Sequence, residues 1–76
     1  GQVVDRDELR RAFHRISPEQ RAVVVMHHYV GLSLPQVAES LGIAEGTARS
    51  RLYYGMRGMR AAIEIGAGTG QTGGMA

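Results

Sequence analysis

Residues 32–60 have the sequence LSLPQVAESLGIAEGTARSRLYYGMRGMR, and this stretch decides the expected fold. Ser33 followed by Gln36 has capping-box spacing, in which the hydroxyl accepts a backbone N–H and the amide side chain reaches back. Pro35 suits the first helical turn, where no amide hydrogen is needed. The pattern therefore predicts a capped helix over about residues 34–41.

A tight turn and a second helix are expected next. Gly42 suits the left-handed position that ends a helix, and Glu45 is favourable at the positive end of the following helix dipole. Ala38 is small enough to let two helices cross closely. These residues predict a second helix over about 45–65 and, with the first, a helix-turn-helix motif.

The second helix of this motif has two distinct faces at about 100° per residue. Its apolar or small residues share one side: Ala48, Leu52, Gly55, Met56, Met59 and Ile63. Its polar and aromatic residues share the other: Gly46, Thr47, Ser50, Tyr53, Tyr54 and Arg57. A solvated face is the plain alternative. The capped helix and glycine turn before it favour a helix that contacts the major groove, where acceptors and thymine methyls predominate.

Two further helices are expected before this motif. Asp5 is placed to cap a helix over about 6–16, and Ser17 a helix over about 18–30 that Gly31 stops. The predicted fold class is therefore all-α, a small four-helix domain with a C-terminal helix-turn-helix.

Three segments divide the chain in this interpretation. Residues 1–4 are expected to be a linker remnant, since the chain starts with Gly1, and residues 5–65 the helix-turn-helix domain. Residues 66–76, GAGTGQTGGMA, hold five glycines and little apolar bulk. We therefore expect that tail to be disordered.

The composition fits a small DNA-binding domain. Seventy-six residues support one domain with a thin core. The formal charge is only +2 and every one of the nine cationic side chains is arginine. Four of them lie between Arg49 and Arg60 with no acid among them, which predicts a basic end that faces DNA.

Several other classes of protein are not supported. The chain has no cysteine, which excludes disulfides and cysteine-based zinc sites. No membrane-length apolar run and no signal peptide are visible, so the cytoplasm is the expected location. His27 and His28 would point about 100° apart on a helix and, like His14, lack accompanying carboxylates. We expect no metal site, no cofactor and no enzymatic activity.

The helix expected over 18–30 has more apolar surface than one face can use. Four of its residues are expected to point inward: Ala22, Val25, Met26 and Tyr29. Val24 would project on the other side, together with Gln20, His27 and His28, as a partner-binding surface. The alternative is that a small domain leaves one valine exposed.

The run from residue 17 to residue 60 resembles region 4 of a bacterial sigma factor of the extracytoplasmic-function group. Four segments carry the resemblance, in the family's order and spacing: SPEQR at 17–21, YVGLS at 29–33, VAE at 37–39 and GTARSRL at 46–52. The resemblance covers roughly residues 9–63. Two positions depart from the family: Ala48 replaces the usual Val or Ile, which predicts looser packing, and Tyr54 stands where a basic residue is common.

The resemblance implies that this domain recognises the promoter −35 element. The residues that it implies contact bases are Thr47, Arg49, Ser50, Tyr53 and Tyr54. The groups that it implies contact phosphates are Ser33, the N–H groups at the start of its helix, Arg51, Arg57 and Arg60.

The resemblance also implies partners. The helix expected over 18–30 and the helix before it would dock on the β-subunit flap of RNA polymerase. An anti-sigma factor would cover the same surface. The domain would act as a monomer, and the half of a sigma factor that binds the −10 element would be missing.

Two alternatives remain. A DNA-binding domain of a LuxR-type response regulator also has four helices and a Glu-Gly-Thr start to its recognition helix, but commonly pairs on two half-sites. The other alternative is a helical module used chiefly for protein interaction.

Overall fold

The structure is a computed structural model that describes the backbone of residues 5–75 and the side chains of residues 5–65. This part of the chain holds helices and no strand, which confirms the all-α class. The elements are α1 (Arg6–His14), α2 (Pro18–Val24), the π-helical segment η1 (Val25–Val30), α3 (Leu34–Leu41) and α4 (Glu45–Met75).

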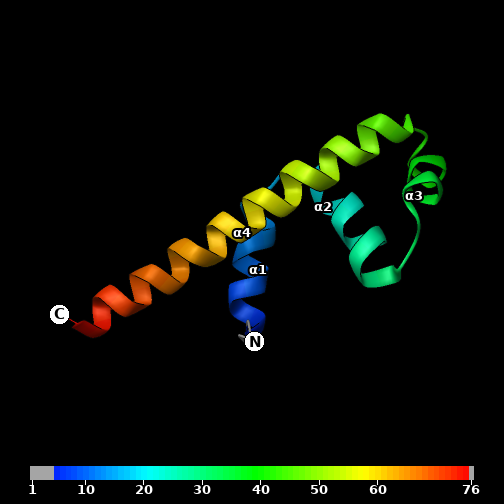
Figure 1. The fold of residues 1–76 in the computed structure, drawn as a ribbon. Helices are drawn as coiled ribbons and strands as arrows, with labels where there is room; N and C mark the ends of the chain where they lie inside the picture. Colours follow the sequence, from blue (N-terminus) through cyan, green and yellow to red (C-terminus); the bar gives the residue numbers. More distant parts are fainter. Residues whose placement is uncertain (1–4, 76) are drawn as a thin grey trace.

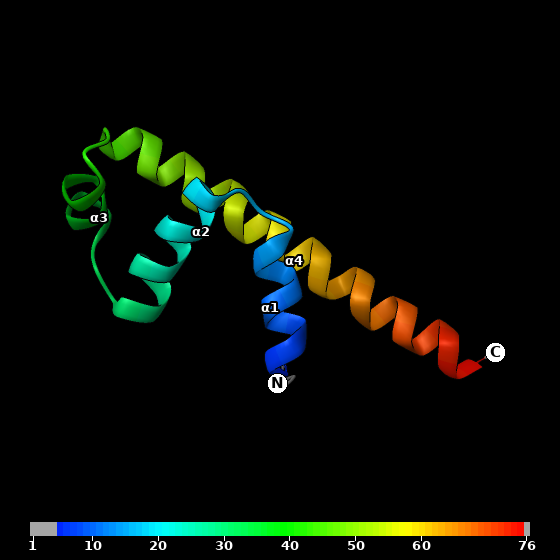
Figure 2. The same ribbon diagram turned by 180° about the vertical axis from the view of Figure 1, so that it is seen from behind.

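The long helix α4 is the axis on which the other elements are assembled. Helices α1, α2 and α3 each pack on it, and the molecule measures 49 × 17 × 17 Å. Figures 1 and 2 show α3 beside the N-terminal end of α4, while α1 and the segment after α2 descend from the same side of it. The outer side of α4 near its N-terminus is left uncovered.

The expected helix boundaries follow from local hydrogen bonds. Asp5 caps α1, and Ser17 and Ser33 form complete capping boxes at the starts of α2 and α3. Gly31 and Gly42 adopt left-handed φ angles of 91° and 67°. Side chains with a Cβ rarely adopt these angles, so both glycines end their helices as predicted.

The single helix expected over residues 18–30 is interrupted. It changes at Val25 from α-helical to π-helical geometry, in which i→i+5 hydrogen bonds widen the turn. The N–H of Leu32 then donates to the carbonyl of Met26 at 3.0 Å. A wider turn changes the angle between successive side chains, so the faces assigned at 100° per residue do not hold here.

One core cluster joins α1 to α4. Its buried members are Ala12, Ile16, Val24 and Met59. Val24 is only 1% exposed, so its expected exposure is wrong. Tyr29 and Val25, expected to point inward, are 57% and 37% exposed instead. The reason is that α2 packs against α4 through Val24, which a single-helix projection cannot reveal.

A second core cluster lies under the helix-turn-helix. Its buried members are Val23, Val37, Ala38 and Ala48. Leu52 packs against both clusters, and the neighbours Val23 and Val24 belong to one each. Ala48 is fully buried. The smaller side chain at this position therefore does not expose the contact between α4 and the rest of the domain to solvent.

Two glycines let α4 approach the earlier helices closely. A Cβ at Gly55 would lie 3.0 Å from Val24 Cγ2, and one at Gly58 would lie 2.8 Å from Ile16 Cγ2. Both distances are tighter than ordinary van der Waals contact. Helix α4 therefore gives up helix propensity at these positions for close packing.

The C-terminal segment differs from expectation. Helix α4 does not end near residue 65, because its backbone is helical through Met75, where a disordered tail was expected. Extending a helix that is already formed avoids the nucleation cost that a separate helix would bear. Figures 1 and 2 show this end of α4 projecting away from the other helices.

Candidate nucleic-acid interface

The uncovered face of α4 carries the side chains expected to contact bases. All five are exposed and come from the first half of the helix: Thr47, Arg49, Ser50, Tyr53 and Tyr54. The buried residue Ala48 holds this half against the domain. The predicted division of α4 into a buried and an exposed face is confirmed.

Tyr53 and Tyr54 form an aromatic pair on this face. Their ring centroids lie 5.1 Å apart at an interplanar angle of 84°, an edge-to-face contact. The rings are 59% and 56% exposed. Two adjacent tyrosines left in solvent present hydroxyl groups and ring edges in a defined arrangement on the outside of α4.

Arg49 forms an ion pair that sequence reasoning did not identify. Its Nη2 lies 2.8 Å from the Oε2 of Glu45, one turn earlier, and both side chains are largely exposed. Such pairs contribute only about 0.3–0.5 kcal/mol to helix stability. Their value here is orientation, because Glu45 holds the guanidinium along the start of α4. The i, i+4 spacing was the available signal.

Ser33 offers less to a phosphate than expected. Its backbone N–H already donates to Gln36 Oε1 at 2.8 Å, and its Oγ accepts from the Gln36 N–H at 3.2 Å. Pro35 has no N–H. The cap therefore occupies the Ser33 and Gln36 N–H groups, and the donors left at this end of α3 are the Leu34 N–H and the Ser33 hydroxyl hydrogen.

The arginines expected to contact phosphates lie along α4. Arg57 and Arg60 are exposed, and Arg51 is half-buried. Within residues 5–65 the one ion pair is that of Arg49 with Glu45. The other three guanidinium groups therefore have no carboxylate partner there, which leaves this side of α4 positively charged.

The side chains expected to bind a partner protein have mostly structural roles. Val24 is buried, Gln20 Oε1 accepts from the Ser17 N–H at 3.0 Å, and His27 Nδ1 lies 2.8 Å from the Leu32 carbonyl. Only His28 is exposed. The structure therefore does not form the partner surface that the helical projection predicted.

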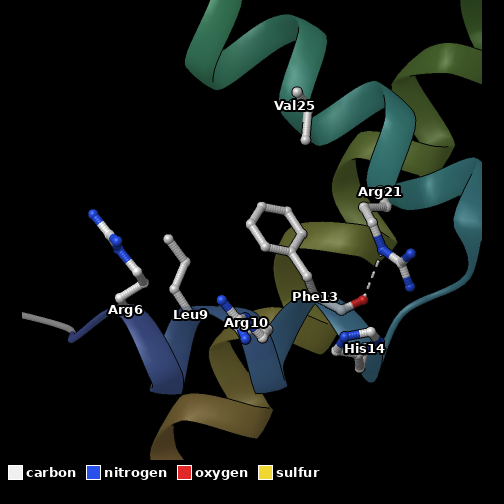
Figure 3. A pocket seen from close by; sticks show the side chains of 7 residues that line it. All are labelled: Arg6, Leu9, Arg10, Phe13, His14, Arg21 and Val25. Carbon is white, nitrogen blue, oxygen red and sulfur yellow. Dashed lines mark hydrogen bonds between the residues drawn. The ribbon is translucent and has the colours of Figure 1, made fainter.

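A different apolar groove lies between α1 and the start of η1, with a volume of about 310 Å³. Figure 3 shows Leu9 and Phe13 of α1 opposite Val25, with Arg6 and Arg10 beside them. The Phe13 ring also lies 5.9 Å from the ring of Tyr29. This groove, which we call the α1–η1 groove, is apolar inside and basic at its rim.

Arg21 supports this groove. Its Nε donates to the Phe13 carbonyl at 3.0 Å, the bond drawn in Figure 3, and its Nη2 to the Ile16 carbonyl at 3.4 Å. The guanidinium adds a donor at the C-terminal end of α1, where the regular i→i+4 hydrogen bonds stop and the Phe13 carbonyl otherwise accepts only the long 3.4 Å bond from the Ile16 N–H and a bond from the Arg15 N–H. No sequence spacing signalled this role, because Arg21 lies on the next helix.

The described residues do not assemble a metal site. No group of three or more histidine, cysteine or acidic side chains comes together among them. The rings of His27 and His28 pack edge-on, with centroids 5.2 Å apart. Within the same part of the chain, no helix has both the length and the apolar character needed to cross a bilayer.

A capped helix, a left-handed glycine turn and a second helix with an exposed arginine and tyrosine face define a helix-turn-helix domain of the nucleic-acid-binding class. Comparison with known families specifies it further. Residues 6–59 match the family described as Sigma-70, region 4, so the chain belongs to this family. This membership favours the sigma-factor interpretation over the response-regulator alternative.

Similar proteins are named as sigma factors. The ECF RNA polymerase sigma factor SigL of Mycobacterium tuberculosis is 43% identical over 62 residues, which cover 82% of this chain and 35% of that protein. The RNA polymerase sigma-E factor of Streptomyces antibioticus is 35% identical over 63 residues, covering 83% of this chain and 35% of its own length. The chain thus spans about a third of the length of these curated relatives.

Proposed function

We propose that this chain is the part of an extracytoplasmic-function sigma factor that recognises the −35 promoter element. The observation that carries the proposal is the exposed face of α4, whose opposite face packs against the domain through the buried Ala48. Membership of the sigma-70 region 4 family supports it. Helix α4 would enter the major groove, as recognition helices of this motif do.

The side chains of this face suit two tasks. Arg49 can donate to guanine, and Tyr53 and Tyr54 can contact thymine methyls or accept and donate hydrogen bonds. Thr47 and Ser50 supply hydroxyl groups nearby. Arg57 and the other arginines of α4 would bind phosphates, which give affinity, while the base contacts give sequence preference.

We further propose that the α1–η1 groove docks RNA polymerase, through its β-subunit flap, and that an anti-sigma factor competes for the same surface. The exposed Val25 and Tyr29 support this surface in place of the buried Val24. The basic rim at Arg6 and Arg10 favours a partner with apolar and acidic side chains.

Tethering to polymerase would compensate for weak DNA binding by the isolated domain. With about four to six phosphate contacts, its affinity should fall steeply with salt. A polymerase-bound domain has a high effective concentration at the promoter. In this proposal the domain acts on chromosomal DNA in the cytoplasm. It acts as a monomer and has no enzymatic activity.

Selection of bound duplexes from a random pool tests the DNA-binding proposal. The chain is used alone and fused to a polymerase flap fragment, each at two salt concentrations. Enrichment of one short asymmetric motif supports a monomeric −35 domain. A palindromic motif contradicts the monomer, and no enrichment with retained protein binding would favour the protein-interaction module.

A further inference from the structure

A basic hollow of about 460 Å³ lies between η1 and α4. Leu52 and Met56 form its apolar floor. Four potential cations surround the floor: His28, Arg49, Arg57 and Arg60. No carboxylate lines it, although Glu45 pairs with Arg49 from one turn away.

We propose that this hollow is an anion site that binds a phosphodiester of the DNA backbone, and that His28 supplies a ligand to it from outside α4. The inference rests on the proposed function, because a helix seated in the major groove has phosphates along its flanks. Arg57 and Arg60 would bind the phosphate from α4, while Arg49, which also lines the hollow, is kept as the proposed base contact. His28 would extend the basic strip from the recognition helix onto a second element.

The position of His28 is fixed by its neighbour. The His27 ring is anchored through Nδ1 to the Leu32 carbonyl at 2.8 Å, and the His28 ring packs edge-on against it. His28 itself is exposed and makes no hydrogen bond to another residue of the described part of the chain. Its ring nitrogens therefore remain available to a ligand at the hollow.

An imidazole at this place makes phosphate binding depend on pH. Histidine acquires a second N–H donor and a positive charge between about pH 8 and pH 5. The charged and titratable groups that face His28 are these: Arg49, Arg57, Arg60 and Glu64 of α4, and His27 and Tyr29 of η1. A bound phosphate stabilises the protonated form, so DNA affinity should rise as the pH falls.

The test measures binding of the 76-residue chain to a duplex carrying its selected motif and to a duplex of the same composition without it. Titrations by fluorescence anisotropy at pH 6 and pH 8 each span several salt concentrations. Four proteins are compared: the wild type, His28→Gln, His28→Lys and, as the matched control on another surface, His14→Gln.

The wild type should bind both duplexes about threefold to fivefold more tightly at pH 6, with a salt slope steeper by up to about 0.9, the value of one phosphate contact. His28→Gln should lose this gain and His14→Gln should keep it. His28→Lys should bind at pH 8 as the wild type does at pH 6, because its charge is permanent.

An unchanged pH dependence in His28→Gln would overturn the anion site. If His28→Gln loses binding to an acidic protein partner while its DNA binding is unaffected, the anion site is overturned as well. The hollow would then be assigned to protein carboxylates. Failure of the wild type to prefer the motif duplex at either pH would instead contradict the proposed function, so the two failures are distinguishable.

Discussion

At the scale of single residues, adjacent valines have opposite surroundings. Val24 packs beneath Gly55 in the core, whereas Val25 lines the α1–η1 groove. Val24→Asp should lower the free energy of unfolding by more than about 4 kcal/mol, because it buries a carboxylate. Val25→Asp should change it by less than about 1 kcal/mol. Chemical denaturation of the two variants checks this contrast.

The same pair of variants tests the groove. Val25→Asp should weaken binding to a polymerase flap fragment while DNA affinity stays near that of the wild type. Full flap binding by a folded Val25→Asp would contradict the proposed docking surface. A Val24→Asp protein that folds normally would contradict the observed packing of α2 on α4.

Arg49 and Arg60 should differ in their effect on DNA sequence preference. Arg49→Ala should cost about 1–3 kcal/mol on the preferred duplex and relax the preference, if its guanidinium contacts a base. Arg60→Ala should weaken all duplexes similarly. Because removal of Arg49 leaves the Glu45 carboxylate unpaired, the comparison is repeated in a Glu45→Ala background, with affinities measured on single-base variants.

A uniform loss across those duplexes for Arg49→Ala, in both backgrounds, would show that Arg49 contacts only the backbone. Recovery of affinity in the double variant would assign the cost to repulsion between Glu45 and DNA.

At the scale of elements, the stability that the N-cap of α1 contributes depends on pH. The backbone N–H of Glu8 donates to the Asp5 carboxylate at 2.7 Å, and this bond lowers the pKa of Asp5 below its ordinary value, with Arg11 adding a smaller effect. The stabilisation is therefore complete above the unfolded pKa, about 3.9, and is lost as the pH falls through the folded pKa.

Asp5→Asn keeps an acceptor for the cap but removes the titration. The melting temperature of the wild type should consequently fall more than that of Asp5→Asn between neutral pH and the acid range, as measured by circular dichroism. Parallel curves for the two proteins would mean that other carboxyl groups account for the whole acid response.

Glycine has two different roles within α4. Gly58→Ala should lower the free energy of unfolding by about 1–2 kcal/mol, since overpacking against Ile16 outweighs the gain of about 1 kcal/mol in helix propensity. Gly46 has open space around it, so Gly46→Ala should be neutral or stabilising. Denaturant titrations compare them, and stabilisation by both substitutions would contradict the close approach of α4 to Ile16.

At the scale of the whole molecule, the two core clusters are expected to unfold together. Val23 and Val24 are neighbours in the chain, and Leu52 packs against both clusters. Val37→Ala should therefore cost on the order of 2 kcal/mol and accelerate amide hydrogen exchange in α1 as well as in α3. Acceleration confined to α3 would mean that the helix-turn-helix opens as a separate unit.

Much of the architecture follows from local chemistry. Serine with glutamine three positions later specifies a helix start, and a left-handed glycine specifies a helix end, because these backbone groups are satisfied by residues a few positions away. The faces of α4 were predictable for the same reason, since a regular 3.6-residue period sets them. The exposure of the residues expected to contact bases was thus predictable without tertiary information.

The helix starts, the all-α class, the family resemblance and the exposed polar face of α4 follow from the sequence alone. The burial of Val24, the support of α1 by Arg21 and the place of His28 beside the arginines of α4 could not be predicted in this way. These features depend on contacts between separate helices and on the π-helical turn at Val25, which alters the angular period. A projection of one helix contains neither the contacts with other helices nor the π-helical turn. The burial of a residue depends on the elements packed around it.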